Sequence, residues 1–194
     1  MQPIKLTDRD ALILVDLQND FLPEGRLPVP CGDETITAAN AYIKIFHRAG
    51  RSIFATRDWH PPDHCSFREA GGSWPQHCVA GTVGAGFADG LALPGETCVI
   101  SKGTARDRDA YSGFQQTDLH ARLKKLGVER LFIGGLALDV CVLSTVLDAL
   151  SLGYQVFLLT DASRAVNVRE GDGDRAIVTM RCGGARLLEQ DQLQ

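Results

Sequence analysis

The feature that most constrains the fold is an alternation of short apolar runs with longer stretches of helical periodicity. Five runs of four or five residues are rich in Ile, Val, Leu and Phe and contain few polar residues. They are Ala11–Val15, Ser52–Thr56, Thr97–Ile100, Arg130–Ile133 and Gln155–Leu159. Strands that are buried on both faces have this near-continuous apolar pattern, so the runs predict a mostly parallel sheet.

Between these runs, apolar residues recur at spacings of three and four. The predicted helices are Thr35–Ala49, Thr117–Leu126 with Thr117 as N-cap, Asp139–Leu152 and Asp174–Arg181. Strands alternating with helices predict an α/β fold, a three-layer sandwich with helices on both faces of the sheet. A length of 194 residues suits one domain, so residues 1–194 are expected to form a single domain.

Composition narrows the class of function. The formal net charge is −4 and no long basic run occurs, which argues against nucleic-acid binding. The first ten residues are polar and charged, and no apolar stretch approaches the ~20 residues of a membrane helix. We therefore expect a cytoplasmic protein without a membrane or nucleic-acid partner. An apolar helix face could pack in the core or at an interface between copies, so the sequence leaves open whether the protein is a homo-oligomer.

Reactive side chains follow the predicted strands. In open α/β sheets the ligand lies beyond the carboxyl ends of the strands, where Asp16, Lys102 and Cys141 are expected. Cys141 begins a predicted helix, and the helix N-terminus favours thiolate, so we expect a lowered pKa and a nucleophilic role. Two simpler interpretations stay open: a buried helix cysteine, and a solvated lysine at a strand end. The other cysteines are scattered and are interpreted as small buried hydrophobes.

A second group combines imidazole and carboxylate. Asp58, His60, His64 and His77 lie in a loop-rich segment that holds three of the five histidines. Asp58 and His60 share one side of an extended strand end, because side-chain direction alternates. Such ligands suit one divalent metal ion, with Zn²⁺ expected first and Fe²⁺ or Mn²⁺ as alternatives. Three protein ligands leave positions open, which is typical of a catalytic or ligand-binding metal.

Several spaced motifs together resemble a known family. ALILVDLQNDF, ATRDWHPPDHCSF, SWPQHCVAGT, KG followed by YSGF, and GLALDVCV resemble, in order, the nicotinamidases (pyrazinamidases) of the isochorismatase-like hydrolase superfamily. The resemblance runs from about residue 11 to about residue 180. It implies a six-stranded parallel sheet and hydrolysis of nicotinamide, a small-molecule substrate, to nicotinate and ammonia through a cysteine thioester. It also implies a place in NAD salvage.

The resemblance also implies a role for individual residues. The catalytic acid, lysine and cysteine fall on Asp16, Lys102 and Cys141. The metal ligands fall on Asp58, His60 and His77, and His64 matches a histidine that binds the metal in some members. The N–H groups of the oxyanion hole fall on Ala137 and Cys141, with a cis Leu136–Ala137 peptide bond. The residues that contact the ring fall on Phe21, Trp74 and Tyr111. The metal is expected to orient the pyridine ring.

Two departures and three rivals accompany this hypothesis. Leu138 stands where members often carry threonine, which bears on substrate preference, and Cys31 stands where glycine is common. The first rival is a related amidase acting on another small amide or carbamoyl compound. The second is hydrolysis by metal-bound water with Cys141 as a bystander. The third is a non-catalytic module that binds a metal, ligand or partner protein in the cleft.

Overall fold

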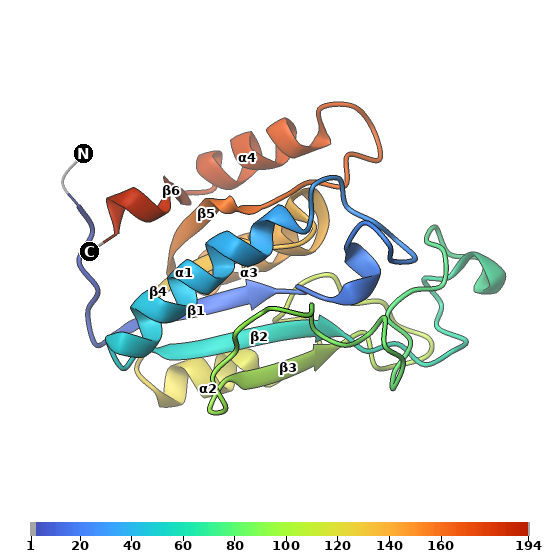
Figure 1. The fold of residues 1–194 in the computed structure, drawn as a ribbon, viewed down its shortest axis with the longest axis horizontal. Helices are drawn as coiled ribbons and strands as arrows, with labels where there is room; N and C mark the ends of the chain where they lie inside the picture. The colour runs from blue at the N-terminus through green and yellow to red at the C-terminus, as the bar shows by residue number, and fades with distance from the viewer. Residues whose placement is uncertain (1–2, 194) are drawn as a thin grey trace.

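A single parallel sheet organises the chain. The computed structural model describes residues 3–193, whose six strands lie in the order β3-β2-β1-β4-β5-β6 (Figure 1). All pairings are parallel, as the apolar runs predict. The strands are β1 (Asp10–Val15), β2 (Ser52–Asp58), β3 (Cys98–Lys102), β4 (Arg130–Gly135), β5 (Gln155–Ser163) and β6 (Arg186–Leu188).

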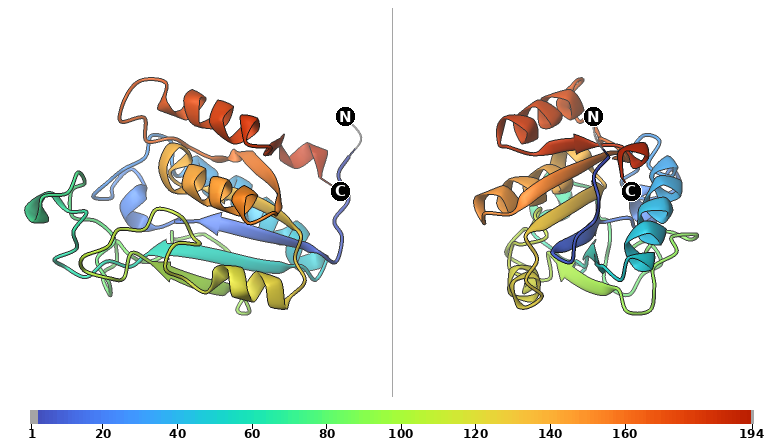
Figure 2. Two further views of the ribbon diagram at one scale, coloured as in Figure 1. Left: turned by 180° about the vertical axis from the view of Figure 1, so that it is seen from behind. Right: turned by 90° about the vertical axis from the view of Figure 1, so that its left-hand side faces the viewer.

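Helices cover both faces of the sheet, which gives the expected three layers. Helix α1 (Glu34–Arg48) lies on one face, and α2 (Leu119–Lys125), α3 (Leu143–Ser151) and α4 (Asp172–Cys182) lie on the other (Figure 2). Leu12 and Leu14 of β1 join the α1-side cluster, whereas Ile13 and Val15 join the other cluster. This division follows from the alternation of side chains along a strand.

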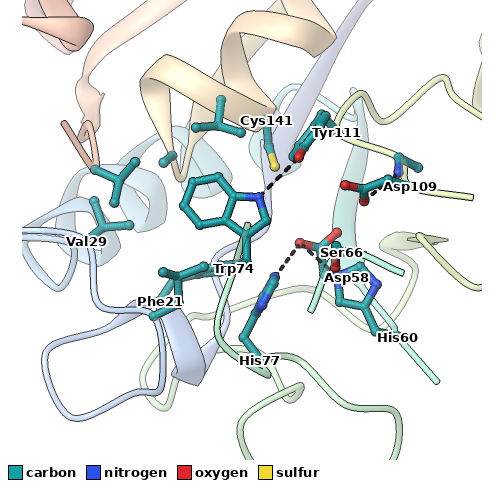
Figure 3. Close-up of a pocket in the computed structure, with 15 residues that line it drawn as sticks. Phe21, Val29, Asp58, His60, Ser66, Trp74, His77, Asp109, Tyr111 and Cys141 are labelled. Atoms are coloured by element: carbon teal, nitrogen blue, oxygen red, sulfur yellow. Dashed lines mark hydrogen bonds and ion pairs between the residues drawn. The ribbon is translucent and has the colours of Figure 1, made fainter. Parts of the chain in front are cut away.

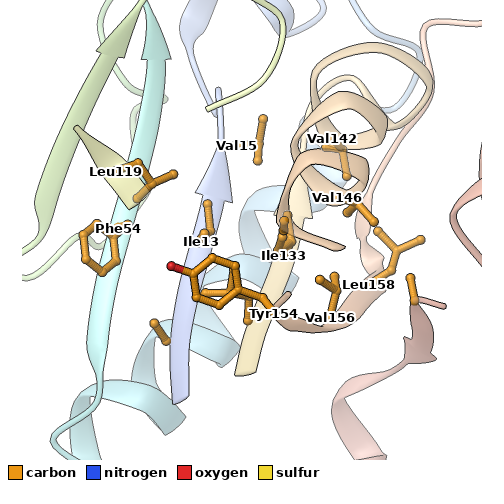
Figure 4. Close-up of a cluster of buried hydrophobic side chains, with 14 of the residues drawn as sticks. Ile13, Val15, Phe54, Leu119, Ile133, Val142, Val146, Tyr154, Val156 and Leu158 are labelled. Carbon is orange, nitrogen blue, oxygen red and sulfur yellow. The ribbon is translucent and has the colours of Figure 1, made fainter. Parts of the chain in front are cut away.

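The cluster beneath α2 and α3 shows how the central strands are buried. Ile13, Phe54, Ile133 and Leu158 contribute side chains from four adjacent strands, and Val146 of α3 packs against them (Figure 4). Each is at most 1% exposed. Fully burying a side chain of this size stabilises the fold by roughly 1.5–3 kcal/mol, so this layer holds the strand ends in fixed positions.

The structure corrects the start of two predicted helices. The predicted helix Asp139–Leu152 begins instead as a π-helical turn, Leu138–Val142, before α3. Helix α2 begins at Leu119 and its flanking residue Asp118 makes no side-chain cap bond, whereas Thr117 Oγ1 accepts from Leu119 N–H at 3.3 Å while donating to Gly113 O at 2.6 Å. Strand β6 has only three residues, too short for a periodic signal. Short 3₁₀ turns occupy Asn19–Phe21, Arg68–Ala70 and Gln190–Gln192.

The strand order reverses direction between β1 and β4. The carboxyl ends of β1, β2 and β3 point toward the long loops of residues 59–97 and 103–118 (Figure 1). A crevice at such a reversal is the usual ligand site of an open parallel sheet. Within residues 3–193, no helix combines the length and apolar character needed to cross a membrane.

Candidate active site

A pocket opens at the point where the strand order reverses. It lies beyond the carboxyl ends of the strands and is partly open to solvent. Apolar and aromatic side chains form most of its wall, and reactive groups converge on one side (Figure 3). Its lining includes Phe21, Val29, Asp58, His60, Trp74, His77, Asp109, Tyr111, Ala137 and Cys141.

The Lys102 ammonium lies at the centre of the reactive groups. Lys102 ends β3, and its Nζ lies 2.9 Å from Asp16 Oδ2, 2.5 Å from Asp58 Oδ1 and 3.4 Å from Cys141 Sγ. It also donates to Ala110 O at 3.2 Å. The side chain is fully buried, so it is no solvated strand end. Burial opposes its charge, but Asp16 and Asp58 outweigh burial and raise the pKa of Lys102 well above its usual value.

Asp16 occupies the first position after β1 in a left-handed conformation, with φ of 49°. Its Oδ1 accepts a hydrogen bond from Thr56 Oγ1 at 2.6 Å. Its Oδ2 pairs with Lys102 by charge but receives no aligned hydrogen bond from any residue between 3 and 193. Carboxylate oxygens of Asp16 and Asp58 and Cys141 Sγ lie within 4.8 Å of one another. Asp16 therefore offers a carboxylate lone pair beside the thiol.

Burial sets the protonation of the acid and the thiol. Removal from water raises the pKa of Asp16, although Lys102 and Thr56 act in the opposite direction. Burial likewise raises the pKa of the Cys141 thiol well above its usual value, with Lys102 opposing and the carboxylates of Asp16 and Asp58 adding to it. The expectation of a lowered Cys141 pKa is therefore wrong for this structure, and a base must take the thiol proton.

The π-helical turn presents Cys141 to the pocket. Val142 N–H donates to Ala137 O at 3.1 Å, and Thr145 Oγ1 donates to Cys141 O at 2.7 Å. The Leu136–Ala137 peptide bond is cis, as the resemblance implies. Ala137 and Cys141 both line the pocket. The two backbone positions expected to form an oxyanion hole thus lie on the same wall as the sulfur.

Asp58, His60 and His77 form a buried cluster. Their ligand atoms lie within 4.8 Å of one another, with Asp58 Oδ2 3.6 Å from His60 Nε2 and 3.9 Å from His77 Nε2. The segments meet because Val79 pairs with His60 in a parallel bridge. Burial opposes the charge on Asp58, but Lys102 and His60 outweigh burial and lower the pKa of that carboxyl.

The hydrogen bonds of the two histidines test whether this cluster suits a metal. His60 Nδ1 lies 2.9 Å from Gly103 O, and His77 Nδ1 lies 2.8 Å from Pro75 O. A carbonyl oxygen only accepts, so Nδ1 carries a proton in both rings and Nε2 is the nitrogen directed toward Asp58, where it would bind a metal in place of a proton. Metal-binding histidines are commonly held by such N–H bonds to carbonyls. One carboxylate and two imidazole nitrogens therefore fit a divalent metal ion.

His64 stands apart from this cluster. Its ring stacks on His60 with a centroid distance of 4.2 Å. Its Nδ1 lies 2.7 Å from Ser66 Oγ, and its Nε2 lies 3.2 Å from Arg108 O. Both nitrogens are therefore engaged by other groups, and the structure does not bring His64 into the set formed by Asp58, His60 and His77.

The three aromatic residues expected to contact a ring all line the pocket. Trp74 lies across its middle, and its indole Nε1 donates to Tyr111 Oη at 3.1 Å (Figure 3). Burial and the nearby Asp109 raise the pKa of Tyr111 to about 12, so its hydroxyl is neutral. Phe21 packs beside His77 with a ring-centroid distance of 5.7 Å. These aromatic side chains and Cys141 therefore form walls of the same pocket.

Sequence reasoning missed several residues that support the site. Thr56 donates to Asp16, Gln18 binds the backbone of Asp58, and Asp20 Oδ2 accepts from Cys78 N–H at 2.6 Å, next to His77. Gln18 and Asp20 are polar residues that come shortly after an apolar strand, and this position in the sequence was the signal that could have found them. Both are buried in the structure, where a polar group needs a partner. Thr56 gives no such signal, because threonine is common within strands.

The sequence and the fold resemble those of known hydrolases. A model of the isochorismatase domain matches residues 10–192. The nicotinamidase of Escherichia coli (strain K12) is 39% identical over 198 residues, which cover 91% of this chain and 93% of that protein. The pyrazinamidase of Pyrococcus horikoshii, in complex with zinc, is 48% identical with a TM-score of 0.90, covering 93% of this chain and 99% of its own. PnC1 from L. infantum, in complex with nicotinate, is 35% identical with a TM-score of 0.91, covering 99% and 98%. The chain belongs to the isochorismatase family.

Proposed function

We propose that this chain is a nicotinamidase, which hydrolyses nicotinamide, and the analogous pyrazine carboxamide, to the acid and ammonia. The observation that carries the proposal is that Cys141 lines one pocket with Asp58, His60 and His77, and that the buried Lys102 contacts both Cys141 Sγ and Asp58. Similarity to a nicotinamidase, a zinc-containing pyrazinamidase and a nicotinate complex supports it. NAD salvage is the pathway that this activity would serve.

In the first half-reaction, Asp16 accepts the proton of the Cys141 thiol while the sulfur forms a bond to the carboxamide carbon. Lys102 stabilises the negative charge on both groups. The N–H groups of Ala137 and Cys141 bind the oxygen of the tetrahedral intermediate; one such donor contributes roughly 3 kcal/mol in other enzymes. Asp16 then returns the proton to the departing nitrogen, so that the C–N bond breaks and ammonia leaves a thioester.

In the second half-reaction, Asp16 accepts a proton from water, which attacks the thioester carbon and releases the acid. The proton returns to the Cys141 sulfur, so the enzyme regains its initial state. Asp58, His60 and His77 would hold the metal, which supplies a Lewis acid that can bind a pyridine nitrogen or a water molecule. Trp74 and Phe21 would contact the ring and direct its amide to the sulfur.

The test combines ammonia release with intact-protein mass spectrometry. We expect ammonia from nicotinamide, and less from small carbamoyl compounds, which the related amidases would prefer. Quenching during turnover is expected to trap a mass increase equal to the nicotinoyl group on Cys141. Absence of ammonia release from nicotinamide by the zinc-loaded protein would refute the proposed function.

The substitution Cys141→Ala separates thioester chemistry from hydrolysis by metal-bound water. We expect the variant to bind zinc normally and to lose hydrolysis, because no sulfur remains to form the acyl-enzyme. A variant that keeps much of the wild-type rate would instead show that Cys141 is a bystander. Chelation of the metal alone cannot make this distinction, since both mechanisms require the ion.

A further inference from the structure

The side chain of Gln18 completes the sheet where β1 leaves it. Strands β1 and β2 pair from Ala11 with Ser52 to Leu14 with Ala55, and Asp16 N–H donates to Thr56 O at 3.2 Å. Beyond Asp16 the chain turns away, so Asp58 at the end of β2 has no strand beside it on this side. The fully buried amide of Gln18 occupies that position.

Three hydrogen bonds fix the orientation of this amide. Gln18 Oε1 accepts from Asp58 N–H at 2.8 Å, and Nε2 donates to Asp58 O at 2.8 Å and to Ala85 O at 2.9 Å. A reversed amide would place its oxygen against two carbonyl oxygens, so only one orientation satisfies all partners. The side chain thus binds Asp58 as the peptide group of a neighbouring strand would.

Asp58 is the residue whose position matters most, because its carboxylate faces two sets of groups. Oδ1 lies 2.5 Å from Lys102 Nζ, whereas Oδ2 faces His60 and His77 at 3.6 and 3.9 Å. A displacement of the Asp58 backbone would therefore change the metal cluster and the Lys102 contact together. A buried amide bound to both backbone groups of Asp58 is well placed to prevent that displacement.

We propose that Gln18 is a positioning residue that holds Asp58 in the geometry required both for metal binding and for its contact with Lys102. The catalytic part of this role rests on the proposed function. The metal-binding part does not, because it concerns the affinity of the Asp58, His60 and His77 cluster alone. Within residues 3–193, the side-chain hydrogen bonds of Gln18 go to the backbone of Asp58 and Ala85 and not to a ligand atom or to Cys141.

The test compares Gln18→Met with Asn19→Ala. Methionine keeps the length of the side chain but removes its hydrogen bonds to Asp58 and Ala85. Asn19 is the matched control, because its Nδ2 donates to Val83 O at 2.9 Å and so contacts the same loop without contacting Asp58. Circular dichroism establishes folding, and competition with a chromophoric chelator gives the zinc dissociation constant without any substrate.

We expect Gln18→Met to raise the zinc dissociation constant by ~10–100-fold, the range found for residues that orient metal ligands. At saturating zinc, kcat for nicotinamide is expected to fall by roughly tenfold, with a smaller change in KM. For Asn19→Ala both quantities are expected to stay within about twofold of wild type. A folded Gln18→Met protein with wild-type zinc affinity and kcat would overturn the proposal.

A second variant covers failure of the first to fold. Gln18→Glu keeps the volume and the acceptor for Asp58 N–H but places an oxygen against Asp58 O and Ala85 O, so zinc affinity is again expected to fall. If neither variant folds while Asn19→Ala does, Gln18 is a folding residue and the proposal is overturned. If wild type binds zinc but leaves nicotinamide intact, the proposed function fails while the zinc comparison still decides the role of Gln18.

Discussion

Replacing Thr56 by valine tests whether Asp16 is the base that accepts the thiol proton. Thr56 Oγ1 donates a 2.6 Å hydrogen bond to Asp16 Oδ1, and both residues are fully buried. Valine keeps the branched shape but puts a methyl group where the donor was. The variant thus removes one hydrogen bond from a carboxylate and leaves the charges of Lys102 and Asp58 unchanged.

The size of the effect follows from the strength of that bond. A hydrogen bond to a charged group contributes ~1.5–3 kcal/mol, and one pKa unit corresponds to about 1.4 kcal/mol. The Thr56 bond lowers the pKa of Asp16, so its loss raises that pKa further. Asp16 must be ionised to accept the proton. The acid limb of kcat/KM is therefore expected to move to higher pH, and kcat/KM on the acid side is expected to fall by about 10- to 150-fold, which is the bond energy expressed as a ratio.

Stability provides a second measurement with a defined sign. The lost bond is stronger when Asp16 is ionised, because the acceptor then carries a charge. The destabilisation of Thr56→Val relative to wild type is therefore expected to be small below the raised pKa of Asp16 and to grow as pH rises through it. Urea denaturation of metal-free protein at a series of pH values measures this difference.

Thr35→Val is the matched control for this experiment. Thr35 is also fully buried, and its Oγ1 donates to the neutral carbonyl of Gly32 at 2.5 Å. We expect this variant to lose stability to a similar degree at every pH and to keep the wild-type acid limb. Rates are measured at saturating zinc with the bound metal quantified. An acid limb that stays in place in Thr56→Val would refute the assignment of Asp16 as the base.

Three further predictions concern the metal, the opposite end of the sheet and the ring-binding side chains. Chelation is expected to abolish hydrolysis. Zinc at ~100 times its dissociation constant is expected to restore hydrolysis and to add about 2.7 kcal/mol to the free energy of unfolding, measured by thermal denaturation. A melting temperature that zinc does not change would contradict a metal site at this cluster. Arg130→Met leaves the buried Asp10 carboxylate without the guanidinium that binds it at 2.5 and 2.6 Å, so about 3 kcal/mol of unfolding free energy is expected to be lost while kcat is kept. A large fall in kcat of the folded protein would disagree with that. Trp74→Ala removes the aromatic face proposed to contact the substrate ring, an interaction worth ~0.5–1.5 kcal/mol, and is expected to raise KM about two- to tenfold with less effect on kcat; an unchanged KM would exclude Trp74 from ring binding.

The sequence predicts the sheet well because its strands are buried on both faces and therefore leave an apolar record. The same apolar runs place Asp16 and Lys102, since Asp16 directly follows one run and Lys102 lies two residues after another. Strand β6 is too short to show such an apolar run, because it has three residues and one of them, Arg186, is exposed. Its place in the sheet depends on pairing with β5, from Phe157 with Arg186 to Leu159 with Leu188, which is a contact rather than a pattern.

Contacts between distant loops could not be predicted in this way. His77 reaches Asp58 because the parallel bridge of His60 with Val79 aligns two segments of the loop-rich region. The raised pKa of Cys141 has the same origin. The sequence shows a cysteine at a helix start, whereas its burial and the proximity of Asp16 and Asp58 arise only in the folded chain. Side chain-to-backbone hydrogen bonds, such as those of Gln18, have no periodicity to detect.

Two groups that are separate in the sequence form one site in the fold, and Asp58 is the reason. The Asp16, Lys102 and Cys141 group and the histidine cluster have different chemistry, but the two oxygens of Asp58 belong one to each. A metal that draws electron density from this carboxylate would weaken its attraction for Lys102, which would leave more of the ammonium's charge to Asp16 and the sulfur. We therefore expect metal occupancy and proton transfer from Cys141 to be coupled through this single side chain, whose geometry would limit both.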